Sequence, residues 1–158
     1  MGLLLARTEC ARPPCGGPLN LATTDLEKSV VFYSTLFEAK PVKNFPDYAL
    51  FVTEEPSLEL ALDQRETVQP ATDAHYGVFV ETTDEVERAI ARLSKAGLSS
   101  STEREETCCY ANQTKVWATD PEGRRWEVYT VHEDTEERDS GDTTCCATDA
   151  ATRSCCAA

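Results

Sequence analysis

The chain has 158 residues, a length that suits one domain and leaves little room for a second. Its 28 Asp and Glu residues outnumber 15 Lys and Arg residues, and the net charge of −13 argues against a nucleic-acid partner, because phosphate backbones would be repelled. The longest apolar run near the start, residues 3–6, is too short to span a membrane, so we expect a cytoplasmic protein with no membrane partner.

Composition divides the chain into three parts. Residues 1–17 contain prolines, glycines and two cysteines and are expected to form a flexible leader. Residues 18–131 hold nearly all of the large apolar side chains and form the expected domain. Residues 132–158 are acidic, have no aromatic residue and carry four cysteines. We expect this last part to be a disordered, Cys-rich tail, because it cannot bury enough apolar surface to fold.

The first half of the domain has one amphipathic helix among short strands. Strands are expected at 18–23, 39–43, 48–53 and 58–62. The helix follows the first strand, and its apolar residues recur at helical spacing: Leu26, Val30, Tyr33 and Phe37. The pattern Thr24-x-x-Glu27 at its start is that of a capping box.

The second half repeats this order. Strands are expected at 75–81, 98–103, 109–118 and 125–131. The helix again lies after the first strand, with Val86, Ile90 and Leu93 at helical spacing. Thr82-x-x-Glu85 predicts a capping box at its start, and Gly97 predicts its end. Thr-Thr-Asp triplets at 23–25 and 82–84 fall at matching junctions, which indicates an internal duplication.

Strand alternation predicts a polar face shared by the two halves. Glu127, His75 and Glu59 each lie on the strand face opposite to their most apolar neighbours. If the halves close into one curved sheet, Glu59 becomes the counterpart of Glu127, and Pro18 the counterpart of His75. Two carboxylates and one imidazole would then share a concave surface.

A histidine and two carboxylates are suitable ligands for a divalent metal with open coordination positions. The simpler alternatives are that His75 is a hydrogen-bonded structural residue and that Glu59 and Glu127 are solvated strand residues. Glu127 lies in a strand that is apolar on both faces. A carboxylate buried there needs a partner or a metal.

Six of the eight cysteines form adjacent pairs, one of which is Cys108-Cys109. Adjacent Cα atoms are about 3.8 Å apart, less than a relaxed disulfide requires. Such pairs suit a thiophilic ion that takes two thiolates at once. The alternative is that Cys108 and Cys109 are small buried residues at the start of a strand, where they would point to opposite faces.

The domain resembles the vicinal oxygen chelate superfamily, which includes glyoxalases, bleomycin-resistance proteins and extradiol dioxygenases. The resemblance lies in the duplicated strand–helix–three-strand unit and in a D-P-x-G turn followed by W-E-V. Five segments are similar to the organoarsenical carbon–arsenic lyase and cadmium-induced protein branch: 25–27, 32–34, 107–110 (T-C-C-Y), 115–117 (K-V-W) and 125–129 (R-W-E-V-Y). The resemblance covers residues 18–131 and implies an α+β fold, in which duplicated βαβββ modules form a curved mixed sheet around a metal cavity.

The resemblance also implies a ferrous site with one ligand from the first strand, a His from the fifth and a Glu from the eighth. His75 and Glu127 match the last two ligands. Pro18 occupies the first position and has no side-chain donor. The third ligand is therefore Glu59, which matches a metal-binding Glu of glyoxalase-like members, or Asn20, or the metal is absent.

The activity implied is Fe(II)-dependent cleavage of the carbon–arsenic bond in trivalent methyl- or aryl-arsenicals, giving arsenite. In this hypothesis Cys108 and Cys109 bind the arsenic, and dioxygen is the second substrate. One alternative is a non-enzymatic As(III) or Cd(II) thiol-binding resistance protein. The other is a glyoxalase-like isomerase with Ni(II) or Zn(II). Because domains of this superfamily often pair, a homodimer is expected.

Overall fold

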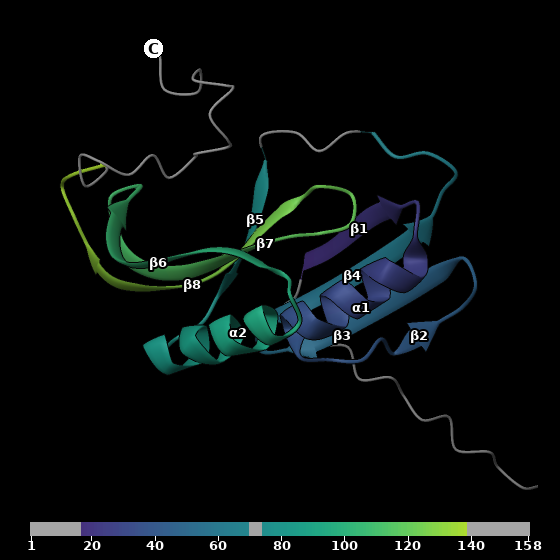
Figure 1. Cartoon of the computed structure of the whole chain (residues 1–158), viewed down its shortest axis with the longest axis horizontal. Helices are drawn as coiled ribbons and strands as arrows, with labels where there is room; N and C mark the ends of the chain where they lie inside the picture. Colours follow the sequence, from purple (N-terminus) through teal and green to yellow (C-terminus); the bar gives the residue numbers. More distant parts are fainter. Residues whose placement is uncertain (1–16, 70–73, 139–158) are drawn as a thin grey trace, which may run out of the picture. The chain divides into compact units, whose positions relative to one another are not determined.

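The computed structural model describes residues 17–69 and 74–138, and these two stretches form two compact units (Figure 1). Each unit has the order strand, helix, and three further strands. The α+β class and the duplicated βαβββ module are therefore confirmed. No helix of the described stretches is long and apolar enough to cross a membrane. The expected leader, apart from Gly17, and most of the expected tail lie outside the described residues, as do the six cysteines other than Cys108 and Cys109.

The first unit is a four-stranded mixed sheet with one helix. Its elements are β1 (Gly17–Thr23), α1 (Leu26–Phe37), β2 (Lys43–Asn44), β3 (Tyr48–Glu54) and β4 (Ser57–Gln64). The strand order is β1-β4-β3-β2, with β1 parallel to β4 and the other pairs antiparallel. The strand expected at 39–43 was mostly wrong, since only Lys43–Asn44 pairs in the sheet. Pro41 has no N–H to donate to a ladder, and Glu38 turns the chain with a φ of 53°.

Helix α1 forms where its periodicity predicts, and it begins at a different cap. Asp25 rather than Thr24 is the N-cap, and its Oδ1 accepts a hydrogen bond from Lys28 N at 3.0 Å. Both residue types cap helices well, so the expected capping box was displaced by one residue. The buried face of the helix contains Phe32 and Tyr33, and Tyr33 contacts Phe51 of β3.

The second unit has the same topology. Its elements are β5 (His75–Phe79), α2 (Thr83–Lys95), β6 (Ser99–Cys108), β7 (Ala111–Thr119) and β8 (Arg125–Asp134), in the sheet order β5-β8-β7-β6. The capping box of Thr82 and Glu85 is confirmed, and Gly97 follows the helix with a φ of 70°. Strand β8 extends to Asp134, three residues past the expected end of the domain at residue 131.

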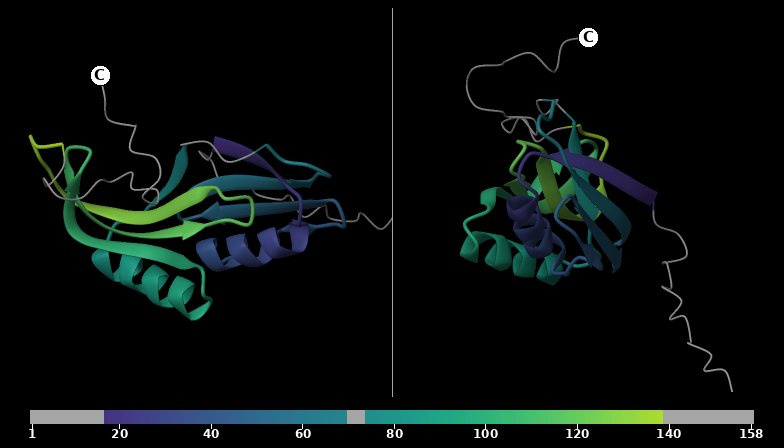
Figure 2. Two further views of the ribbon diagram at one scale, coloured as in Figure 1. Left: turned by 45° about the horizontal axis from the view of Figure 1, so that its top comes forward. Right: turned by 90° about the vertical axis from the view of Figure 1, so that its right-hand side faces the viewer.

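Helix α2 covers one face of this second sheet (Figure 2). Its buried residues are Val86, Ala89 and Leu93, and the strands contribute Val78, Val116, Trp126 and Val128 to the buried core. Since side chains alternate along a strand, the opposite face carries His75, Lys115 and Glu127. The predicted separation of apolar and polar faces in β5 and β8 therefore agrees with the structure.

The registers of the two units differ by two residues at the positions of interest. Glu59 pairs with Pro18 across β4 and β1. In the second unit Glu127 pairs with Gly77, and His75 pairs with Arg125. The two expected equivalences, of Glu59 with Glu127 and of Pro18 with His75, therefore cannot both hold.

Two irregularities in the second sheet meet at Thr114 of β7. The β6–β7 register shifts between Glu103 and Glu106, and Glu105 has a φ of 52°. The β7–β8 register shifts opposite His132. Thr114 Oγ1 accepts a hydrogen bond from Glu105 N at 3.2 Å and lies 2.8 Å from His132 Nε2. Such bulges bend and twist a sheet locally, here between its middle and the β6–β7 turn.

Candidate metal and thiol site

The structure brings His75 and Glu127 together on the face of the second sheet opposite to α2. His75 Nε2 lies 3.5 Å from Glu127 Oε1, and the two residues come from the parallel strands β5 and β8. The side chain of Glu127 is only 11% exposed, and within the described residues its buried Oε2 accepts no hydrogen bond, although it forms an ion pair with Lys115 at 3.3 Å. A carboxylate oxygen left in this state beside an imidazole nitrogen suits a divalent cation.

Lys115 of β7 is the basic residue closest to this carboxylate among those described. Its side chain is 3% exposed, and its Nζ lies 3.3 Å from Glu127 Oε2 and 3.9 Å from Glu103 Oε2. A buried ammonium between two carboxylates lowers the cost of burying all three charges. Sequence reasoning did not single out Lys115 as a site residue. Its position directly before Val116 and Trp117 in a strand was the available signal.

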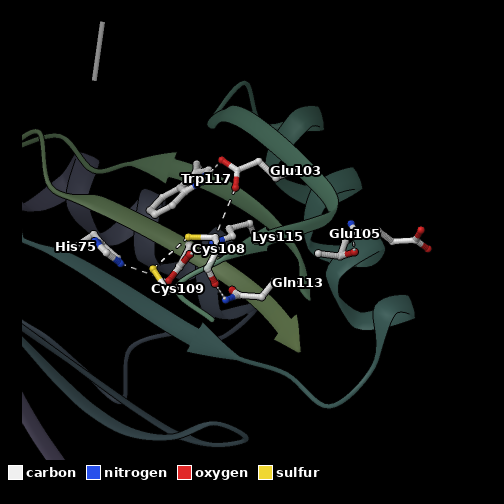
Figure 3. Close-up of polar contacts among 10 residues, drawn as sticks. His75, Glu103, Glu105, Cys108, Cys109, Gln113, Lys115 and Trp117 are labelled. Atoms are coloured by element: carbon white, nitrogen blue, oxygen red, sulfur yellow. Dashed lines mark hydrogen bonds and ion pairs between the residues drawn. The ribbon is translucent and has the colours of Figure 1, made fainter. Parts of the chain in front are cut away.

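The ring of Trp117 packs beside the ring of His75 (Figure 3). Its ring meets the His75 ring edge to face at 5.3 Å between centroids, and its Nε1 donates a hydrogen bond to Glu103 Oε1 at 2.9 Å. The guanidinium of Arg125 stacks over the same ring at 4.1 Å. These contacts fix the indole and thereby restrict the orientation of the imidazole.

Tyr129 lies two residues beyond Glu127 on the same face of β8. Burial raises the pKa of the Tyr129 hydroxyl above its usual value, and the negative charge of Glu127 adds to this rise. The hydroxyl is therefore protonated at neutral pH and can act only as a neutral hydrogen-bond donor or acceptor. The ring packs edge to face against Phe79 at 5.7 Å.

Because Gly77 has no side chain, the carboxylate of Glu127 and the ring of Tyr129 can lie close to its backbone. A Cβ at this position would lie 2.9 Å from Tyr129 Cε1 and 3.3 Å from Glu127 Oε1. We expect Gly77→Ala to displace both side chains and to weaken binding of Co(II) or Fe(II), measured by anaerobic titration calorimetry, by roughly 10-fold or more. Gly97→Ala is the matched control, since no atom lies within 4 Å of its added Cβ, so it tests backbone strain alone. Equal metal affinity in the two variants would contradict this prediction.

The other candidate ligands, Asn20 and Glu59, lie in the first unit. Asn20 on β1 donates a hydrogen bond from Nδ2 to Asp63 Oδ2 at 2.9 Å. Glu59 lies on β4 opposite Pro18. Over residues 17–69 and 74–138, no three His, Cys, Asp or Glu side chains cluster closely enough to hold a metal. The donors that meet are thus the imidazole of His75 and the carboxylate of Glu127, a pair that fits two positions of an iron, nickel or zinc site.

Cys108 and Cys109 lie at the turn between β6 and β7 rather than at the start of a strand. Cys108 is the last residue of β6 and is buried, whereas Cys109 is exposed. Their Sγ atoms are 3.2 Å apart (Figure 3). Cys108 is also disulfide-bonded, whereas Cys109 is free. The expectation that the two side chains point to opposite faces was therefore wrong.

The cysteine turn lies well along the sheet from His75 and Glu127. Ala111, which pairs with Cys108, also pairs with Asp134, seven positions beyond Glu127 in β8. At about 3.3 Å per residue this is a contour of roughly 23 Å. The site therefore has two parts, an imidazole–carboxylate pair and a pair of cysteines.

Comparison with known proteins agrees with this architecture. Residues 17–128 match the family described as the glyoxalase/bleomycin resistance protein/dioxygenase superfamily. A trivalent organoarsenical cleaving enzyme of Bacillus sp. (strain MD1) is 44% identical over 129 residues, which cover 81% of this chain and 80% of that protein. The cadmium-induced protein CadI of Mycobacterium tuberculosis (strain ATCC 25618 / H37Rv) is 46% identical over 126 residues, 78% of this chain and 80% of that protein.

A solved structure shows the same fold at low identity. The fosfomycin resistance protein FosX from Listeria monocytogenes, complexed with Mn(II) and sulfate, superposes with a TM-score of 0.56 at 16% identity. The match covers 74% of this chain and 92% of that one. The chain belongs to the glyoxalase/bleomycin resistance protein/dioxygenase superfamily.

Proposed function

We propose that this chain is an Fe(II)-dependent lyase that uses dioxygen to cleave the carbon–arsenic bond of trivalent methyl- or aryl-arsenicals. The observation that carries the proposal is the combination of two Sγ atoms 3.2 Å apart with a buried carboxylate that lies 3.5 Å from an imidazole. Relatives 39–44% identical that are named organoarsenical cleaving enzymes support it. The enzyme would act on a small molecule as a cytoplasmic protein, and a homodimer is its expected assembly.

The cysteine pair would capture the substrate. Two thiols of reduced Cys108 and Cys109 replace the two hydroxyl groups of methylarsonous acid and release two waters. Thiolates suit this soft element, whereas the nitrogen and oxygen donors of His75 and Glu127 suit a divalent first-row metal. Capture requires that the Cys108 disulfide is first reduced.

His75 and Glu127 would hold the iron, and when bound the iron supplies the activation of dioxygen. Trp117 keeps the His75 imidazole in place, and Lys115 compensates the charge of Glu127. Because the cysteine turn lies seven positions along β8 from Glu127, the thiols and the metal ligands are separate parts of the site. The bulges that meet at Thr114 bend the strands between these two parts.

The overall reaction balances with one dioxygen. Methylarsonous acid and O₂ give formaldehyde and arsenite, so carbon is oxidised and arsenic remains trivalent. The test is arsenic speciation after anaerobically purified, Fe(II)-loaded protein is mixed with methylarsonous acid, with and without air. Arsenite with an equal amount of formaldehyde, formed only in air, is the expected result. Unchanged methylarsonous acid in both samples would reject the proposal.

A sequestering function is the second candidate, and Pro18 favours it. Proline has no side-chain donor for the first ligand position. Among the described residues, His75 and Glu127 then supply two metal ligands instead of three. Such a protein would bind As(III) or Cd(II) through its thiols and form no product. A Ni(II) or Zn(II) isomerase gives the cysteines no role, and the metal content of the purified protein distinguishes it from the other two.

The tail cysteines provide a prediction of their own. Deleting residues 140–158 removes four thiols that we propose collect arsenic and raise its concentration at Cys108 and Cys109. The rate of cleavage should then fall at low arsenical concentration and match that of the full chain at saturation. Initial rates over a range of substrate concentrations measure this. An unchanged rate at the lowest concentration would show that the tail has no part in delivery.

A further inference from the structure

The tip of the β6–β7 hairpin has a backbone that its residues do not favour. Thr107 pairs with Asn112 and Cys108 with Ala111, so Cys109 and Tyr110 form a two-residue turn. Both have positive φ, 57° and 67°. Positive φ at both positions defines a type I′ turn, where Asn and Gly are preferred because other side chains are strained there. Strain of this kind persists where the surrounding structure holds it, and it concentrates at functional sites.

This turn is what brings the two sulfur atoms together. Consecutive residues of a strand point to opposite faces. With Cys109 in the left-handed region, its side chain turns toward that of Cys108, and the Sγ atoms are 3.2 Å apart. Two thiolates complete the coordination of a trivalent arsenical that carries one organic group, whereas Zn(II) takes four ligands.

Main-chain contacts hold the turn in place. The carbonyl oxygen of Tyr110 accepts a hydrogen bond from Thr135 N at 2.8 Å, and Tyr110 N donates to the carbonyl of Arg138 at 3.4 Å. Gln113, which is buried, donates from Nε2 to the carbonyl of Cys108 at 3.0 Å. The ring of Tyr110 is 54% exposed. The contacts that define the turn are therefore made by the backbone of Tyr110 and not by its phenol.

We propose that Tyr110 is a positioning residue whose left-handed backbone, held by Thr135 and Arg138, shapes reduced Cys108 and Cys109 into a chelating pair for one As(III) in preference to Zn(II). The inference rests on the proposed function, in which this pair captures the arsenical. It goes further by assigning the selectivity of capture to the backbone conformation next to the thiols.

The test compares four substitutions at position 110 in the full-length chain, reduced and with the other six cysteines changed to serine. Tyr110→Asn and Tyr110→Gly accept positive φ, Tyr110→Val resists it because it is β-branched, and Tyr110→Phe removes only the hydroxyl. The probes are phenylarsine oxide and Zn(II), titrated separately by calorimetry. Thermal unfolding checks that each variant is folded.

The Asn, Gly and Phe variants should bind phenylarsine oxide within about 2-fold of the parent. The Val variant should bind it about 10-fold more weakly, because the competent turn is less populated, and its preference for arsenic over zinc should fall. Parental affinity in a folded Val variant would overturn the inference. So would a loss in Gly, which would show that the side chain matters; the Gly result is decisive even if the Val variant does not fold. If the parent binds no better than its Cys109→Ser version, the proposed function itself fails.

Discussion

Replacing Glu127 with glutamine should abolish metal binding and cleavage together. The Glu127 carboxylate is the one that reaches His75, and an amide is a poor, neutral substitute for it as a ligand. We expect the affinity for Fe(II) or Co(II) to fall at least about 100-fold, and arsenite production to fall to background. Anaerobic titration calorimetry and arsenic speciation on the same preparation measure both effects.

Glu103→Gln is the matched control for this variant. Glu103 also contacts Lys115, with Oε2 3.9 Å from Nζ, and it accepts the Trp117 hydrogen bond. The control therefore perturbs the same buried lysine without removing a proposed ligand. It should retain metal binding, while both variants lose roughly 1–3 kcal/mol of unfolding free energy in urea. Metal affinity that falls equally in both variants would indicate a structural role for Glu127 instead of a ligand role.

Replacing Cys109 with serine should abolish capture of arsenic and leave the metal site intact. Serine is similar in size but offers a hard oxygen, so the two-sulfur chelate is lost. We expect affinity for phenylarsine oxide at this site to fall at least about 100-fold and cleavage of methylarsonous acid to disappear. Metal binding should be unchanged, because the turn lies seven positions along β8 from Glu127.

The converse variant tests whether the two parts of the site act independently. His75→Ala should lose metal binding and cleavage and still capture phenylarsine oxide at Cys108 and Cys109. Cys155→Ser, in another adjacent pair, is the control for removing one thiol of eight and should retain cleavage at saturating substrate. If Cys109→Ser still released arsenite at the parental rate, the thiols would have no part in the reaction.

The fold followed from the sequence where local pattern determines structure. Apolar spacing located both helices, and the capping box at Thr82 formed because Glu85 lies at the right spacing to bond back. The first residue of α1 was harder to locate, because Thr24 and Asp25 are adjacent and both are good N-cap residues. Alternation placed His75 and Glu127 on one face of their strands, and the structure places them together.

The features missed depend on cross-strand register or on backbone strain. Lys115 reaches Glu127 only because β7 and β8 pair in a particular register, which the local sequence of either strand does not specify. The two-residue offset that makes the two expected equivalences incompatible has the same origin. The turn at Cys109 and Tyr110 was missed because neither residue favours positive φ, so turn preferences pointed elsewhere.

His75 and Glu127 also join the beginning and the end of the second unit. They come from its first and last strands, β5 and β8, and are 52 positions apart in the chain. A cation held by both would cross-link the unit and close a long loop, whose entropy would otherwise favour the unfolded chain. By mass action, metal at 100 times its dissociation constant would add about 2.7 kcal/mol to folding stability. Metal supply would then control how much folded protein persists as well as how fast it works, and the rise in melting temperature with added metal measures this coupling.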